Sequence, residues 1–156
     1  MNTTRIRQVF YILFFFFGLP VASLAQSENS SDVKKVAGKG ESNFTGSVSV
    51  KMYTEPGNPL NCTMGRVSFQ PMARTNWHKH PGGQMLLVTE GIAFYQERGG
   101  KKRVLHKGEA VTCSPNVEHW HGASPDGLMT HITVGPNTEK GAVIWLEKVV
   151  DEVYLK

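Results

Sequence analysis

Residues 78–84 of this chain read His-Lys-His-Pro-Gly-Gly-Gln, and residues 119–121 read His-Trp-His. On a β-strand, residues two apart point to the same face, so each His-x-His pair directs two imidazoles toward one point. Imidazole is a ligand for Mn, Fe, Co, Ni, Cu and Zn, and the Gln84 carbonyl oxygen is a harder donor. The two segments together therefore predict a metal site.

The sequence around these segments has the pattern of short β-strands. Val67 and Phe69 alternate with polar residues, while residues 85–88 are entirely apolar, as in a strand covered on both sides. Further strands are predicted over 93–96, 104–105, 110–113, 129–134 and 143–149, with a brief helical turn from residue 151. Turn signals rich in Gly, Pro, Asn and Asp separate them. We therefore expect an all-β antiparallel sandwich or barrel.

The two-residue period of a strand also indicates which side chains share the interior. If His78 and His80 point inward, so does Gln84, together with residues 86 and 88. Residues 119 and 121 share a face of their strand, as do residues 129, 131 and 133. The opposite face carries the large apolar side chains of Trp77, Met85, Leu87 and Trp120. We expect a second sheet or a subunit partner to cover that face.

The N-terminal segment has the features of a secretory signal peptide. Arg5 and Arg7 precede an apolar stretch from Val9 to Leu19, and Ser23-Leu24-Ala25 provides small residues at a cleavage site. We expect residues 1–25 to be a cleaved signal, residues 26–42 to be a disordered linker, and residues 43–156 to be one folded domain. We therefore expect the mature protein to be exported to the periplasm and not to stay in the membrane.

Charge and cysteine content exclude some classes of function. Without residues 1–25, which hold two arginines and no acid, fifteen basic residues face thirteen acidic ones. This balance does not indicate nucleic-acid binding, and the largest basic cluster is Lys101-Lys102-Arg103 in an expected hairpin turn. Cys62 and Cys113 lack neighbours at metal-ligand spacing. An exported protein can form a disulfide, but two small buried side chains fit these strand contexts equally well.

These residues resemble the cupin superfamily, whose first motif is G-x5-H-x-H-x3-E-x6-G. His78, His80 and Gly91 are in register with it, with Gln84 in place of the acid and Met72 in place of the first glycine. In the second motif, G-x5-P-x-G-x2-H, Gly108 and His119 are in register, with Ser114 in place of the proline and Asn116 in place of the second glycine. Asn tolerates the positive φ of a glycine position. The resemblance implies a single-domain jelly-roll barrel, also called a double-stranded β-helix.

A closer resemblance is to small bacterial cupins that act as manganese-dependent hydroxynitrile lyases, or (R)-mandelonitrile lyases. It is carried by strings at 44–46, 73–81, 83–84, 119–123 and 129–131. It implies that His78, His80, His119 and Gln84 hold a divalent metal, Mn(II) first, with Fe(II), Ni(II) or Zn(II) as alternatives. It also implies that His121 is a general base and that His131 lines the pocket as a second catalytic candidate.

Each of these residues also has a simpler interpretation. His121 can instead hydrogen-bond a ligand or water beside the metal, His131 can be a hydrogen-bonded core residue, and Gln84 can lie outside the ligand set. Thr75 is a candidate for a hydrogen bond to substrate, and Val67 and Gly65 are candidates for the pocket wall. Ordinary strand packing explains these last three equally well.

The leading hypothesis is therefore a metal-dependent carbon–carbon lyase that cleaves or forms cyanohydrins of the mandelonitrile type. One alternative is an Fe(II)-dependent cupin dioxygenase acting on a small organic substrate, because it needs the same histidines. Another is a non-catalytic periplasmic module that binds a small ligand. The expected partners are a small-molecule substrate and further copies of the chain, as a homodimer or homotetramer.

Overall fold

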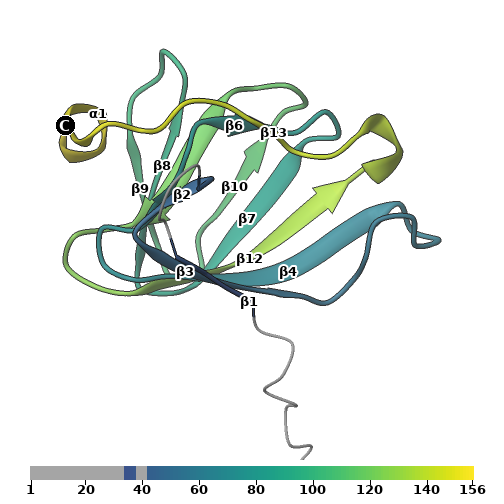
Figure 1. Ribbon diagram of the computed structural model, residues 1–156, viewed down its shortest axis with the longest axis horizontal. Helices are drawn as coiled ribbons and strands as arrows, with labels where there is room; N and C mark the ends of the chain where they lie inside the picture. The colour runs from purple at the N-terminus through teal and green to yellow at the C-terminus, as the bar shows by residue number, and fades with distance from the viewer. Residues whose placement is uncertain (1–33, 38–41) are drawn as a thin grey trace, which may run out of the picture.

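The computed structural model describes residues 34–37 and 42–156 (Figure 1). Its strands form two antiparallel sheets that close around one core. The first sheet has the order β1 (Lys34–Ala37), β3 (Ser47–Met52), β4 (Cys62–Phe69), β12 (Met129–Pro136), β7 (Gln84–Glu90) and β10 (Ala110–Cys113). The second has the order β13 (Ile144–Trp145), β6 (His78–Lys79), β11 (His119–Ala123), β5 (Arg74–Thr75) and β2 (Phe44–Thr45). β8 (Ile92–Glu97) pairs with β11 and with β9 (Arg103–His106). The predicted all-β single-domain barrel is confirmed.

The inward faces of both sheets build the core, as the alternation in the sequence predicts. Val67 and Phe69 of β4 and residues 86 and 88 of β7 are buried, together with apolar residues of β3, β8, β9, β10, β11 and β12. β12 lies in the middle of the first sheet, where His131 pairs with Val67 on one side and Val88 on the other. This register brings His131 into the interior.

Within the described residues, no second sheet covers the outer face of β7. Residues 85–88 are apolar without interruption, yet they alternate between interior and surface: Met85 is 41% exposed and Leu87 is 43% exposed. The chain itself therefore covers one face of β7 and leaves the other face exposed. The partner that would cover the other face, in a homodimer or homotetramer, stays a prediction.

The outward face of the second sheet is covered, but by an unexpected element. Trp77 and Trp120 are buried against Val149 and against Tyr154 of the short helix α1 (Asp151–Leu155). The predicted cover was a second sheet or another subunit, and the C-terminal segment of the same chain takes that place. The two-residue period of a strand shows that a face is apolar, but it does not show which segment packs on that face.

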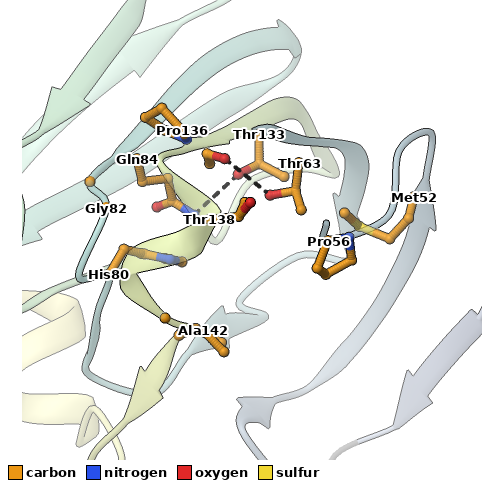
Figure 2. A pocket seen from close by; sticks show the side chains of 14 residues that line it. Met52, Pro56, Thr63, His80, Gly82, Gln84, Thr133, Pro136, Thr138 and Ala142 are labelled. Carbon is orange, nitrogen blue, oxygen red and sulfur yellow. Dashed lines mark hydrogen bonds between the residues drawn. The ribbon is translucent and has the colours of Figure 1, made fainter. Parts of the chain in front are cut away.

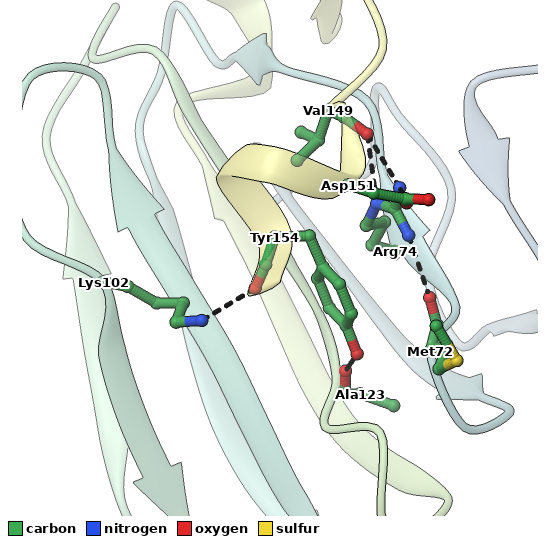
Figure 3. Close-up of polar contacts among 7 residues, drawn as sticks. All are labelled: Met72, Arg74, Lys102, Ala123, Val149, Asp151 and Tyr154. Atoms are coloured by element: carbon green, nitrogen blue, oxygen red, sulfur yellow. Dashed lines mark hydrogen bonds and ion pairs between the residues drawn. The ribbon is translucent and has the colours of Figure 1, made fainter. Parts of the chain in front are cut away.

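Polar contacts around Arg74 hold this segment in place, as Figure 3 shows. The Arg74 guanidinium donates to the carbonyl oxygens of Val149 and Met72 and to the Asp151 carboxylate, and it lies 4.6 Å from the centroid of the Tyr154 ring. The Tyr154 hydroxyl in turn donates to the Ala123 carbonyl at 2.8 Å. We call these residues the Arg74 cluster. It ties the C-terminal segment to β5 and β11.

The ends of the domain differ from the sequence prediction in two places. Residues 34–37, inside the expected linker, form β1 and pair with β3, because an open sheet edge offers main-chain hydrogen bonds to almost any sequence. The expected last strand over 143–149 is limited to Ile144–Trp145, and the helical turn from Asp151 is present. The predicted signal peptide lies outside the described residues. Within the described part of the chain, no helix has the length and hydropathy of a membrane span.

Two positions where the cupin motifs have glycine keep the backbone of a glycine. Met72 has φ +65° and Asn116 has φ +62°, both in the left-handed region. Asn adopts this region more readily than other side chains, as expected, whereas a methionine there is strained. A 3-10 turn at Thr138–Lys140 completes the described elements.

Candidate metal centre

Three of the predicted ligands converge at the ends of two neighbouring strands. His78 begins β6 and His119 begins β11, and the two residues are paired directly across the antiparallel ladder. Their ring centroids are 4.2 Å apart. His80 follows at the same-face spacing, and one ring nitrogen from each of the three histidines lies within 4.8 Å of the others. The structure thus brings together the three histidines of the two sequence segments.

The surroundings of Nδ1 indicate where the protons of His78 and His119 lie. His78 Nδ1 is 3.0 Å from the carbonyl oxygen of Asn76, and His119 Nδ1 is 3.0 Å from that of Val117. A carbonyl oxygen only accepts, so in each neutral ring Nδ1 donates and Nε2 keeps its lone pair. Both imidazoles therefore offer the interior the unprotonated nitrogen that a metal ion binds.

Gln84 faces His119 in a way that suits a cation. The Gln84 amide Nε2 donates to Thr133 Oγ1 at 3.1 Å, which directs its Oε1 to within 3.0 Å of His119 Nε2. With the His119 proton on Nδ1, these two facing atoms are both acceptors. Burial lowers the pKa of His119, which disfavours a second proton on its ring. Two acceptors this close repel each other unless a cation lies near both.

His80 provides a further nitrogen without a protein partner. Its Nε2 is buried and makes no hydrogen bond to any described residue. Burial, followed by the charge of His119, lowers the pKa of His80 from 6.5 to about 4. The pKa of His78 is lowered as well, chiefly by burial. All three rings are thus neutral at pH 7, the form that ligates a metal, and three imidazoles with one amide oxygen fit a divalent cation.

His121 and His131 lie beside His78 and outside the cluster of three candidate ligands. The His121 ring centroid is 5.2 Å from that of His78 and 4.9 Å from that of His131, and Phe69 packs against both rings. His121 Nδ1 and both nitrogens of His131 are buried without a hydrogen-bond partner among the described residues. Burial, the first cause, lowers the pKa of both rings, that of His131 to about 4. Each is a neutral base with a free lone pair.

The site opens into two connected chambers. The inner chamber has a volume of about 130 Å³ and the outer chamber one of about 330 Å³. Both are bordered by Met52, His80, Gln84, Thr133 and Val143. The inner chamber is completed by Phe44, Val50, Val67, Phe69, Thr75, His78, His121, His131 and Trp145. Figure 2 shows the outer chamber, with Gln84 and His80 on one side and Met52 and Pro56 on the other.

The three predicted substrate-binding residues have different positions. Val67 and Thr75 line the inner chamber. The Thr75 hydroxyl accepts a hydrogen bond from the His121 backbone N–H at 3.1 Å, so it holds the strand that carries His121. Gly65 does not border either chamber. It pairs with Met52 across β3 and β4, and a Cβ at Gly65 would lie 2.7 Å from Met52 Sδ.

Sequence reasoning did not identify several residues of the site. Trp145 contacts His78 with ring centroids 4.9 Å apart and also packs on Phe44. The expected strand over 143–149 contains Trp145, but the direction of its side chain was not predicted. Cys113 is buried and free, like the partly buried Cys62, and its Sγ lies 3.0 Å from His119 Nδ1. No sequence pattern indicates that contact, because it depends on how β10 and β11 meet in three dimensions.

Comparison with known proteins adds evidence from outside the chain. Residues 65–135 match the family described as Cupin domain. The (R)-mandelonitrile lyase of Granulicella tundricola is 40% identical over 128 residues, which cover 79% of this chain and 98% of that protein.

Solved structures agree on the fold. A cupin-like protein from Thermotoga maritima has a TM-score of 0.71 and 48% identity, over 76% of this chain and 90% of that one. A cupin 2 conserved barrel domain protein from Rhodopseudomonas palustris has a TM-score of 0.60 at 14% identity, over 79% of this chain and 80% of that one, and shows the fold alone.

Proposed function

The chain belongs to the cupin superfamily, and we propose that it is a metal-dependent lyase that cleaves or forms small cyanohydrins of the mandelonitrile type. The observation that carries the metal dependence is the convergence of His78, His80 and His119, whose ring nitrogens lie within 4.8 Å of one another, with Gln84 Oε1 3.0 Å from His119 Nε2. The observation that supports the reaction is the similarity over most of the chain to a protein named (R)-mandelonitrile lyase.

The metal would be held by His78, His80, His119 and Gln84. A divalent cation bound there supplies Lewis acidity, which lowers the pKa of a substrate hydroxyl, and four neutral ligands leave its charge undiminished. The family resemblance favours Mn(II), whereas the donor set also suits Fe(II), Ni(II) and Zn(II).

The protein's own side chains would then transfer one proton from the substrate hydroxyl to the leaving cyanide. In cyanohydrin cleavage, His121 takes the proton of the substrate hydroxyl, the O–H electron pair forms the carbonyl bond, and the C–CN pair leaves with cyanide. The proton then passes from His121 to cyanide, so the products are an aldehyde and HCN. Burial keeps His121 neutral and therefore able to accept, and a positioned base of this kind contributes roughly 10²–10⁴-fold to rate. His131, the nearest base to it, is placed to share that proton.

The inner chamber selects against charged substrates. Among the described residues that line it, Phe44, Phe69 and Trp145 give an aromatic wall, and no Lys, Arg, Asp or Glu borders it. An aryl or branched alkyl group packs well there, while a free carboxylate or phosphate finds no cationic side chain.

The test combines metal analysis with two activity assays on the purified chain. We expect about one metal ion per chain and cyanide release from mandelonitrile after loading with Mn(II). His119→Ala should lose both the metal and the activity. Oxygen uptake with Fe(II) and no cyanide release would instead identify a cupin dioxygenase, and small-ligand binding without any turnover would identify a binding module.

A further inference from the structure

We propose that the outer chamber binds an apolar extension of the substrate and that Met52 is the residue that determines how far this extension reaches. The proposal rests on the function proposed above, because it places the reacting carbon in the inner chamber. It implies that the preferred substrate is larger than mandelonitrile.

The first argument is where the chambers meet. Candidate ligands His80 and Gln84 form one side of the junction, while Met52 and Val143 border it from other elements. Figure 2 shows Met52 across the cavity from His80 and Gln84. A group attached to a reactant near the metal therefore has a direct path outward between these side chains.

The second argument is size. Pockets for drug-sized ligands have volumes of about 300–1,000 Å³. The inner chamber, at about 130 Å³, is below this range and holds little more than the reacting carbon with one small ring. The outer chamber, at about 330 Å³, lies within it. Most of the space in the site is thus outside the part that the reaction itself needs.

The third argument is the chemistry of the outer walls. The side chains there are apolar or uncharged, chiefly those of Met52, Pro56, Thr63, Pro136, Thr138, Ala142 and Val143. The Thr63 hydroxyl already donates to the Gly135 carbonyl at 3.4 Å. Because no Lys, Arg, Asp or Glu of the described residues lines this chamber, it favours an alkyl or aryl extension over a carboxylate or phosphate.

The fourth argument concerns Met52 itself. It points inward from β3 opposite Gly65, whose missing Cβ leaves the space that the Met52 thioether occupies. Met52 is 39% exposed, and an unbranched thioether side chain adapts easily to different neighbours. A larger, stiffer residue at this position narrows the junction, and a shorter one joins the two chambers.

The experiment compares cyanohydrins that differ only in a para substituent: mandelonitrile and its 4-methyl, 4-ethyl and 4-butyl derivatives. Burial of each methylene group is worth about a four-fold gain, so kcat/KM of the Mn(II)-loaded chain should rise at least ten-fold from mandelonitrile to the butyl compound. Met52→Phe should remove most of that gain, measured as the ratio of kcat/KM for the butyl compound to kcat/KM for mandelonitrile, while Met52→Leu, a matched control, should keep this ratio.

A second variant and a binding measurement separate this proposal from the lyase assignment. Val143→Phe narrows the junction between the chambers from the other side, so it should lose the chain-length gain as Met52→Phe does. Calorimetric binding of benzyl alcohol and 4-butylbenzyl alcohol, which cannot react, should show the same chain-length gain and its loss in Met52→Phe. If the alcohols follow this pattern but no cyanide is released, the proposal for the outer chamber holds and the lyase assignment fails. If the wild type gains nothing from chain length in either assay, or if Met52→Phe weakens short and long compounds equally, the proposal is overturned.

Discussion

The Arg74 cluster and the histidines of the inner chamber are both buried polar regions of one small barrel, but their hydrogen bonding differs completely. Arg74 is only 4% exposed, and its guanidinium reaches two carbonyl oxygens, one carboxylate and the face of an aromatic ring. His121 and His131 are also buried and His80 is half-buried, yet several of their nitrogens have no partner within the described structure.

This difference separates two reasons for burying a polar group. A buried donor or acceptor without a partner costs about 1–3 kcal/mol, so a cluster of them weakens the fold. Satisfied groups such as Arg74 hold segments together, whereas unsatisfied groups gathered at one cavity indicate that something outside the chain completes them. The comparison predicts opposite consequences for substitutions in the two regions.

The largest expected effect is on catalysis. His121→Leu should lower kcat for cyanide release by roughly 10²–10⁴-fold, because the proposed base is removed. It should leave the free energy of unfolding unchanged or raise it slightly, since the buried Nδ1, which has no hydrogen-bond partner among the described residues, is replaced by a hydrocarbon. Metal content, measured in parallel, should stay the same. A loss of several kcal/mol in urea unfolding would show that His121 is structural, like Arg74.

A smaller effect, on stability instead of rate, is expected for the satisfied cluster. Arg74→Met should lower the free energy of unfolding by about 3 kcal/mol, because the Val149 carbonyl loses its donor and the C-terminal segment loses its main attachment. Asp151→Asn, at the exposed end of the same ion pair, should cost less than about 1 kcal/mol. Urea unfolding of the two variants checks this, and equal effects would contradict it.

The smallest effect is a pH dependence that only the unsatisfied region produces. The pKa of His131 is lowered by burial from 6.5 to about 4, so as the pH falls the unfolded chain takes up a proton before the folded protein does. The stability that depends on the neutral ring is complete above pH 6.5 and is lost as the pH falls toward 4. Between pH 7.5 and 5.5 the loss from this one ring is about 1 kcal/mol.

Unfolding of the metal-free chain at these two pH values measures that loss, and His131→Leu provides the control. The variant should lose about 1 kcal/mol less than the wild type over the same interval. An identical pH dependence in both proteins would mean that His131 is solvated or paired, and the contrast between the two regions would be weaker.

Many of the side chains that point into the interior could be predicted from the sequence, because strand periodicity is a local property. The spacing of His78 and His80, and of His119 and His121, placed these rings on shared faces, and the same period placed Gln84 and Thr133 inside. Which segment packs on an apolar face is not local. The cover over Trp77 and Trp120 comes from Val149 and Tyr154, and no periodicity in either segment indicates the other.

The lining of the outer chamber could not be predicted from the sequence for a related reason. Pro56, Thr138 and Ala142 belong to connections between strands, where side-chain direction does not follow a fixed repeat. Trp145 is on a two-residue strand whose place in the sheet depends on pairing with β6. The residues expected to ligate and to react were therefore accessible to sequence analysis, whereas the shape of the space around them was not.

The pairing of β13 with β6 has a consequence for how the protein is made. Every other side chain that lines the inner chamber is synthesised before Trp145, which closes its wall beside His78. Until residues after 144 leave the ribosome, the three imidazoles can meet but cannot be enclosed. A metal ion held by these imidazoles would therefore be open to exchange until this late segment docks.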